Sequence, residues 1–163
     1  MNEKQLRLRE ELVDALPHFT GTEEYHRLRY PWLRRQFLIT DGIKFVADKA
    51  SAYWLLDIIA SHFSNQRVAN EPFQVWRLIV NLEGEADLGR FEEVQDDNQA
   101  MQAIRSWIPG SRTGQALIVA DNGNGKLLVR QAIPYTSFPL PEFTFYVTND
   151  EYNGIVVMLT SEY

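Results

Sequence analysis

The sequence predicts an α+β protein, with a mainly antiparallel sheet of five or six strands and helices packed on one face. Three observations support this fold class. Helical repeats of apolar residues dominate the first part of the chain, segments rich in branched and aromatic residues follow one another in the last third, and 45% of the 163 residues are hydrophobic. Helices that come early and strands that come late are typical of an α+β domain, and this apolar content is enough to bury a core. We therefore expect a single domain over residues 1–163.

The first predicted element is a helix over residues 3–16, where apolar side chains recur at helical spacing until Pro17 ends the repeat. A second, short helix is predicted to follow it. Thr20 and Glu23 have the spacing of a capping box, in which each side chain binds the backbone amide of the other residue, so this helix would extend to about Leu28.

A strand and a long helical region come next. Residues 36–40 are rich in apolar residues, which favours a strand, and Asp41 then leads into a helical region over residues 43–63. We expect this region to break near Ala50 and Ser51. Its second half is apolar nearly all round, so we expect that half to lie inside the protein.

The remaining elements are mostly strands. Residues 73–82 carry the aromatic and branched side chains that are common in strands. Residues 98–108 repeat apolar side chains at helical spacing, and Asp96 or Asp97 suits the N-cap position of that helix. Further strands are expected at residues 116–120, 126–133, 143–148 and 155–160.

The segment from Asp121 to Lys126 has features of two ligand-binding loops but meets the requirements of neither. A phosphate-binding P-loop needs a glycine five positions before Gly125 and a hydroxyl residue after Lys126, where this chain has Ala120 and Leu127. A calcium-binding EF-hand loop needs oxygen ligands at alternate positions, two of which are glycine here. The segment is therefore interpreted as a β-hairpin turn, because Asp, Asn and Gly accept the positive φ that such turns require.

Composition and charge exclude several classes of protein. Without cysteine the chain has no disulfide, zinc–thiolate site or thiol nucleophile, and its three histidines lack metal-ligand spacing, so we expect no metal and no cofactor. No apolar run is long enough to span a membrane, and the charged N-terminus lacks the apolar centre of a signal peptide, so a cytoplasmic protein is expected. The net charge of −6 disfavours broad binding to nucleic acid through phosphate neutralisation.

Polar residues within apolar stretches are the first candidates for a site. Asp57 lies in the most apolar part of the predicted helical region, so its carboxylate must be neutral, paired, or at the wall of a cleft. We expect an ion pair with Arg77 or Lys44, or a hydrogen bond to a loop amide. The alternative is a catalytic acid or base role, for which Asp57 and Asp41 are the candidates. A shared ligand site would bring together Asp41, Lys44, Tyr53 and Asp57.

A basic and aromatic segment, residues 26–35, is the second candidate. Arginines suit phosphates and aromatic rings suit base stacking, so this segment is typical of a small nucleic-acid-contacting element. We favour the other interpretation, an exposed loop whose arginines pair with the abundant acidic residues of the protein while Trp32 fills part of the core. The candidate binding residues here are Arg27, Arg29, Trp32, Arg34 and Arg35.

Several longer motifs together resemble a bacterial domain-of-unknown-function family. They are TDGIKFVADKASAYWLLD, DNGNGK, YTSFPLPEFTFY and the terminal SEY, and the likeness covers most of the chain after about residue 18. Members of that family are shorter in the middle, so residues 84–112, which include the predicted helix 98–108, look like an insertion. The resemblance implies a compact α+β domain in a bacterial cytoplasmic or mobile-element setting. It implies no activity, and no catalytic residue is carried over from it.

Together these observations favour a non-enzymatic interaction protein that binds a protein partner, as an accessory factor encoded with mobile or defence-related genes. The support is that the sequence shows no metal site, no nucleotide loop, and no nucleophile with a base near it. The first alternative is a small hydrolase or ligand-binding domain that uses Asp57 and Asp41. The second alternative is a nucleic-acid binder that acts through residues 27–35.

Overall fold

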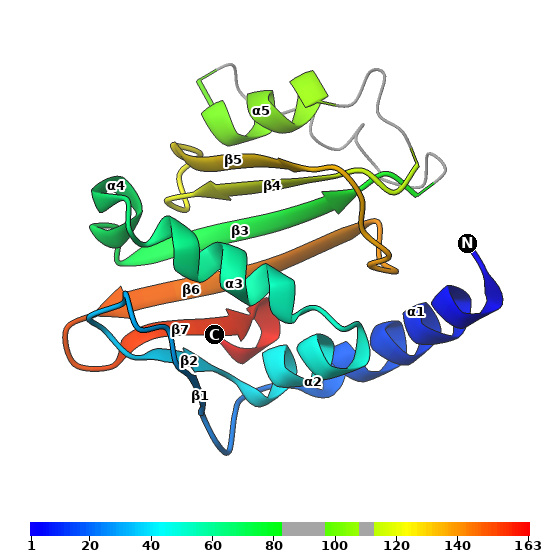
Figure 1. Ribbon diagram of the computed structural model, residues 1–163, viewed down its shortest axis with the longest axis horizontal. Coiled ribbons are helices and arrows are strands. Elements are labelled where there is room, and N and C mark those ends of the chain that lie inside the picture. Colours follow the sequence, from blue (N-terminus) through cyan, green and yellow to red (C-terminus); the bar gives the residue numbers. More distant parts are fainter. Residues whose placement is uncertain (83–96, 108–112) are drawn as a thin grey trace.

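The computed structural model describes residues 1–82, 97–107 and 113–163, in which seven strands form one sheet (Figure 1). The strands are β1 (His26–Leu28), β2 (Phe37–Ile39), β3 (Phe73–Val80), β4 (Ala116–Asp121), β5 (Leu127–Ile133), β6 (Glu142–Asp150) and β7 (Gly154–Leu159). The α-helices of the described ranges are α1 (Glu3–Ala15), α2 (Asp41–Lys49), α3 (Tyr53–His62), α4 (Gln66–Ala69) and α5 (Gln99–Trp107). Across the sheet the strand order is β1-β2-β7-β6-β3-β4-β5.

The α+β class is confirmed, but the sheet is larger than the predicted five or six strands and it is mixed. β2 and β7 run parallel, with Phe37 opposite Ile155, whereas the other neighbouring pairs are antiparallel. The β6–β7 hairpin fixes the direction of β7, and β2 joins its outer edge before the chain turns into α2. β1 and β2 have three residues each, which is too short for a recognisable period-two pattern.

The prediction of a helix from Thr20 to Leu28 is wrong. These residues, all of them described, form a loop and then β1. Thr20 and Glu23 do not cap each other. The amide of Asp41 donates to the Thr22 hydroxyl at 3.0 Å, and the amide of Glu23 donates to the Asp41 carboxylate at 3.0 Å. The polar residues of this loop therefore bind the start of α2 instead of starting a helix of their own.

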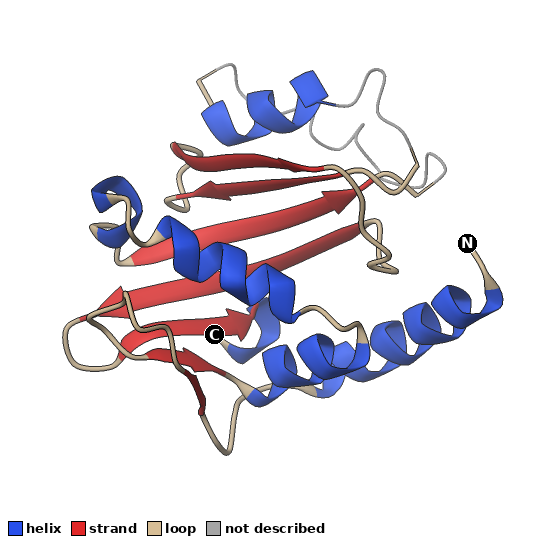
Figure 2. Ribbon diagram, in the orientation of Figure 1, coloured by secondary structure: helices blue, strands red, loops and turns tan. Residues whose placement is uncertain are grey.

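The main core lies between the sheet and helices α1, α2 and α3. Trp76 of β3 is fully buried and stacks on Phe145 of β6, with 6.3 Å between the ring centroids. Leu12 of α1 and Ile59 of α3 are buried in the same cluster. Figure 2 shows α3 lying across the middle of the sheet, with α2 and α1 toward its β1–β2 end.

A second, smaller core lies on the opposite face of the sheet, so the prediction of helices on one face only is wrong. Met101 and Ile104 of α5 pack with Leu117 and Val119 of β4. These two β4 residues alternate along the strand with Ile118, which belongs to the main core, and alternate residues of a strand point to opposite faces. Burial of β4 on both faces follows from this arrangement.

The predicted helix over residues 98–108 is present as α5, and its N-cap is Asn98. The Oδ1 atom of Asn98 accepts a hydrogen bond from the amide of Met101 at 3.1 Å, which is the bond that an N-cap residue makes. Asp97 therefore does not hold the predicted capping position. Asp96 lies outside the described residues, and of the proposed insertion at 84–112 the structure describes residues 97–107.

The helical region predicted over residues 43–63 is present as two helices, and the predicted break is confirmed. Ser51 has a φ of 50°, which is a left-handed conformation that no helix continues through. The break changes the direction of the chain, so that α2 covers one end of the sheet and α3 crosses its centre (Figure 1).

The segment after Asp121 is the predicted β-hairpin turn, between β4 and β5. Gly123 and Gly125 have φ angles of 88° and 84°, which glycine adopts without strain. The Asp121 carboxylate accepts from the amide of Gly123 at 2.6 Å, and the Asn122 side chain accepts from the amide of Asn124 at 2.9 Å. The Asp and Asn side chains of this segment thus bind their own turn.

Candidate functional site

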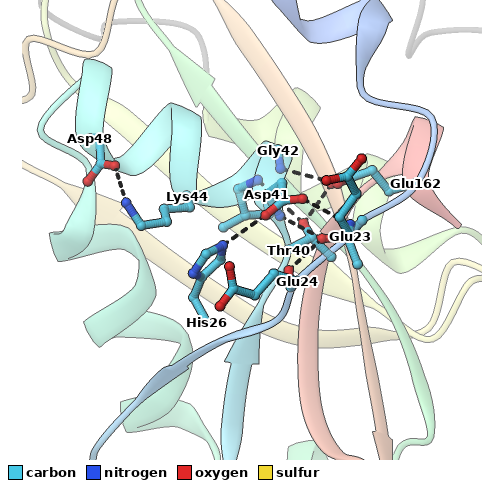
Figure 3. Close-up of polar contacts among 11 residues, drawn as sticks. Glu23, Glu24, His26, Thr40, Asp41, Gly42, Lys44, Asp48 and Glu162 are labelled. Carbon is cyan, nitrogen blue, oxygen red and sulfur yellow. Dashed lines mark hydrogen bonds and ion pairs between the residues drawn. The ribbon is translucent and has the colours of Figure 1, made fainter.

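The first turn of α2 is bound by a carboxylate from a distant part of the chain. Glu162, in the 3-10 helix η3 (Thr160–Glu162) after β7, accepts from the Thr40 hydroxyl at 2.6 Å and from the amide of Gly42 at 3.2 Å (Figure 3). It also accepts from the amide of Leu159 at 3.0 Å. Free amides and the positive end of the helix dipole favour an anion at this position. Glu162 therefore fixes the segment after β7 to α2.

Gly42 provides the space that this junction needs. A Cβ atom at this position would lie 2.4 Å from Cδ1 of Leu159 and 2.6 Å from Oε1 of Glu162. Both distances are shorter than those at which Cβ atoms approach non-bonded atoms in proteins. Two of the motifs that carry the family resemblance, TDG and SEY, therefore meet in space, and what they form is a packed, hydrogen-bonded junction.

Asp41 lies beside this junction and binds the loop that leads into β1. Its carboxylate is 2.8 Å from Nε2 of His26, and it accepts from the amide of Glu23. The hydrogen bond from His26, followed by the backbone bond from Glu23, lowers the pKa of Asp41 below its usual value. The side chain is 31% exposed. One oxygen of this carboxylate thus has its partner in β1, and the other has its partner in the loop before β1.

The lowered pKa of Asp41 predicts a pH-dependent contribution to stability. Because the folded pKa lies below the ordinary 3.8, the ionised carboxylate stabilises the fold above that pH, and this contribution is lost as the pH falls through the folded pKa. In thermal melts from about pH 7 to about pH 2.5, the melting temperature of Asp41→Asn should lie below that of the wild type at neutral pH and should approach it in acid. Asp14→Asn, an exposed position on α1, is the control and should match the wild type throughout. A constant gap between Asp41→Asn and the wild type would contradict this assignment.

Lys44 and Tyr53 meet on a third residue, Asp48, which the sequence analysis did not single out. The Lys44 ammonium is 2.7 Å from one oxygen of Asp48, and the Tyr53 hydroxyl donates to the other oxygen at 2.6 Å. The hydrogen bond from Lys44, and then that from Tyr53, lowers the pKa of Asp48. The same bonds raise the pKa of Lys44 and of Tyr53. This cluster links α2 to α3 at the surface.

Asp57 is exposed, so the expectation that it lies inside the protein is wrong. It accepts a hydrogen bond from the Tyr30 hydroxyl at 2.6 Å. Neither expected cation reaches it, because Lys44 pairs with Asp48 and Arg77 pairs with Asp121. Burial, followed by the bond to Asp57, raises the pKa of Tyr30, so Tyr30 remains the proton donor. Of the four residues expected to share a site, Lys44 and Tyr53 therefore share a partner, whereas Asp41 and Asp57 each have different partners.

The basic segment forms an exposed surface at the β1 end of the sheet. We call Arg27, Arg29, Trp32, Arg34 and Arg35 the arginine surface; all five residues are exposed. Trp32 is 56% exposed, so the alternative in which it fills part of the core is wrong. Its ring packs against Tyr30, with 5.1 Å between the centroids, and Tyr30 in turn packs edge-on against Phe37 at 5.2 Å.

The arginines of this surface do not pair with acidic residues as expected. Within the ranges that the structure describes, no ion pair is found for Arg27, Arg29 or Arg34. Arg35 donates to the side-chain oxygen of Asn149. Three guanidinium groups are therefore available to a binding partner.

Two grooves lie beside the arginine surface. One, of about 380 Å³, is lined by residues 27–31 and 33–37. The other, of about 410 Å³, lies between residues 32–35 and the end of α3 with α4. Residues 33–35 separate the two grooves, and the arginine surface thus has hollows on both sides that can accept side chains of a partner.

The described ranges contain neither a cluster of metal ligands nor a membrane-spanning helix. There, no three histidine or acidic side chains are close enough together to hold a metal ion. None of the helices in those ranges has the length and apolar character needed to cross a membrane.

Sequence reasoning missed Asp48 and Glu162, and it considered Tyr30 only as a ring for base stacking. Asp48 stands four positions after Lys44, a helical spacing at which opposite charges pair, and this signal was available. Tyr30 lay within the basic segment, but no local pattern pairs it with Asp57. Glu162 stands in the SEY motif, but nothing in that motif indicates a contact with α2, which Glu162 reaches only through the fold.

Comparisons with known proteins give a family and nothing more specific. No curated protein and no solved structure matches the chain significantly. Residues 10–163 match a family described as a family of unknown function, DUF6876. The match includes the last part of α1, which lies before the region covered by the sequence motifs. The chain therefore belongs to the DUF6876 family.

Proposed function

We propose that this chain is a non-enzymatic accessory protein of the bacterial cytoplasm, and that it binds an acidic segment of a protein partner at the arginine surface. The observation that carries the proposal is the environment of Trp32. Its ring is exposed, yet it packs on Tyr30, which Phe37 and the carboxylate of Asp57 hold in place. A tryptophan held in one orientation loses little side-chain entropy when a partner covers it.

The residue types around Trp32 are those that dominate binding energy in protein interfaces. Tryptophan and arginine are both enriched among such residues. A guanidinium group binds a carboxylate through two parallel hydrogen bonds, which gives direction as well as charge attraction. The free guanidinium groups of Arg27, Arg29 and Arg34 therefore favour a partner that presents carboxylates.

An acidic protein segment suits this surface better than nucleic acid does. The chain has a net charge of −6, and carboxylates lie beside the surface, where Asp57 binds Tyr30 and the charge of Asp150 interacts with that of Arg35. These acids repel a continuous phosphate backbone. A protein segment can place its acidic residues at the arginines and its apolar residues at Trp32.

The hydrolase or ligand-binding alternative has less support. Asp57 is exposed and is hydrogen-bonded to Tyr30, and Asp41 is bound by the loop before β1. Neither carboxylate lines the grooves beside the arginine surface.

A charge reversal tests the proposal. The tagged protein is used to capture binding partners from a bacterial lysate with and without nuclease treatment, and the captured proteins are identified by mass spectrometry. We expect a defined acidic protein to be captured, and its yield to fall roughly tenfold or more in the triple variant Arg27→Glu, Arg29→Glu, Arg34→Glu, because attraction becomes repulsion. Trp32→Ala should weaken capture while keeping the charge.

The control changes the charge equally at other exposed positions. The triple variant Arg7→Glu, Lys126→Glu, Arg130→Glu lies outside the arginine surface and should capture the partner as the wild type does. Equal losses in both triple variants would contradict a site at the arginine surface. Capture that disappears with nuclease would instead support the nucleic-acid alternative.

A further inference from the structure

We infer that the partner segment binds in extended form, as an additional strand along the outer edge of β1, and that acidic and apolar residues alternate along it. This inference rests on the proposed function and adds to it the conformation and the sequence pattern of the partner.

The first observation is that β1 has one neighbour in the sheet. It pairs with β2, with His26 opposite Ile39 and Leu28 opposite Phe37, and no described strand lies on its other side. Figure 2 places β1 at the margin of the sheet, with no helix of the described ranges beyond it. Within the described residues, residues 26–29 make no backbone hydrogen bonds except those to β2. An antiparallel pairing leaves the outward amides and carbonyls of an edge strand free to bind a further strand.

The opposite margin of the sheet differs. At the start of β5 the carbonyl of Leu127 accepts from the Arg67 guanidinium at 2.5 Å, and the amide of Leu127 donates to Oε1 of Gln99 at 3.1 Å. Side chains from α4 and α5 therefore bind backbone groups where β5 begins. β1 has no comparable side-chain partners among the described residues, so its edge is open to an additional strand along its whole length.

The side chains of β1 determine the pattern of the incoming strand. Leu28 lies opposite Phe37, on the face that the main core occupies, and Arg27 lies opposite Leu38, on the other face. Arg29 stands two positions after Arg27, the spacing at which an extended chain returns to the same face. Opposite charges on neighbouring strands stabilise the pairing. Acidic residues at every second position would therefore lie beside the two arginines, with apolar residues between them toward Leu28 and Trp32.

A second copy of this chain fits the same edge poorly. Two β1 strands side by side would bring Arg27 and Arg29 of one copy next to those of the other, and like charges on neighbouring strands destabilise pairing. Short, charged edge strands are a common protection against self-association. The arginines of β1 repel another basic strand and attract an acidic one. They therefore determine which kind of strand can pair with this edge. The groove of about 380 Å³ along residues 27–31 and 33–37 is lined by arginines and by apolar residues such as Leu28 and Leu33, so it can take acidic and apolar side chains of that strand.

The test uses two fluorescein-labelled octapeptides of one composition, measured by fluorescence anisotropy at low salt. One alternates, Glu-Val-Glu-Thr-Glu-Val-Glu-Thr, and the other is blocked, Glu-Glu-Glu-Glu-Val-Thr-Val-Thr. We expect the alternating peptide to bind roughly tenfold tighter, because strand addition requires the alternation and charge alone does not. The double variant Arg27→Glu, Arg29→Glu should lose this binding, whereas Lys126→Glu, Arg130→Glu should keep it.

Backbone methylation of the alternating peptide separates strand addition from side-chain binding. N-methyl groups on one alternate set of residues should abolish binding, because those amides face β1, and N-methyl groups on the other set should leave it nearly unchanged. Equal binding of both octapeptides that still depends on the two arginines would overturn the inference and leave the proposed function standing. A lack of binding by either peptide, together with successful capture of a partner from lysate, would also overturn the inference. Loss of both peptide binding and partner capture would overturn the proposed function as well.

Discussion

Gly154→Ala is expected to lower the free energy of unfolding by about 2–4 kcal/mol, from left-handed strain and a steric clash together. Gly154 begins β7 with a φ of 77°, and a Cβ atom there would lie 2.5 Å from the carbonyl oxygen of Gln36. That carbonyl accepts from the amide of Ile155 at 2.9 Å where β2 meets β7. The clash is with backbone, so a change of rotamer cannot relieve it. Chemical denaturation followed by tryptophan fluorescence measures the change.

Gly21→Ala is the matched control for this substitution. No atom lies within 4 Å of a Cβ built at Gly21, so its unfolding free energy should stay within about 0.5 kcal/mol of the wild type. Because β2 follows directly on the arginine surface, Gly154→Ala should also weaken partner capture, although it changes no charge. Equal stabilities of the two alanine variants would show that β2 does not hold this register in solution.

Glu162→Ala is expected to lower the free energy of unfolding by about 2–3 kcal/mol, since hydrogen bonds to a charged acceptor are among the stronger ones. The substitution removes the acceptor of three hydrogen bonds, from the Thr40 hydroxyl, the amide of Gly42 and the amide of Leu159. The Gly42 amide, in the first turn of α2, has no acceptor within its own helix. Thermal and chemical denaturation both measure the change.

Two further variants separate the geometry of this junction from its charge. Glu151→Ala removes an exposed carboxylate from the β6–β7 turn and should leave stability unchanged within about 0.5 kcal/mol. Glu162→Gln keeps one acceptor oxygen and should be destabilised by less than Glu162→Ala, because the bonds from Thr40 and Leu159 to Oε1 can persist while the charge and the bond from the Gly42 amide to Oε2 are lost. A Glu162→Ala protein as stable as the Glu151→Ala protein would rule out a structural role for the junction.

Elements whose signals are local could be predicted from the sequence. The β4–β5 turn was predicted because its Asp, Asn and Gly residues can adopt the required backbone, and the side-chain bonds that close the turn reach no more than four residues. The break at Ser51 was likewise visible as a change in helical pattern. The capping box at Thr20 was also a local signal, but it was wrong because the partner of this loop is Asp41, in the next helix.

Elements that depend on distant pairing could not be predicted. The parallel pairing of β2 with β7 joins Phe37 to Ile155, and no pattern in three residues reveals such a neighbour. The contacts of the candidate site could not be predicted either. Lys44 and Tyr53 do share a partner, but that partner is Asp48, and Glu162 reaches α2 from beyond β7.

The exposure of Asp57 could have been predicted from the spacing of the polar residues in its helix. On α3, Tyr53, Asp57 and Ser61 are all exposed and stand four residues apart, which is one turn of a helix and marks a single face. The buried residues lie between them, at Leu55 and Ile59. Composition suggested a helix that is apolar all round, whereas the spacing of its polar residues indicated an amphipathic one.

The parallel pairing of β2 with β7 also sets the order in which the protein can mature during synthesis. The ribosome releases the arginine surface early, but the three-residue pair of β1 and β2 has no further strand to join until β6 and β7 have been made and have formed their hairpin. Before that moment the residues of the arginine surface belong to a chain without a sheet edge to hold them. Under the proposed function, a partner that requires their folded arrangement is therefore expected to bind only chains whose translation has passed β7.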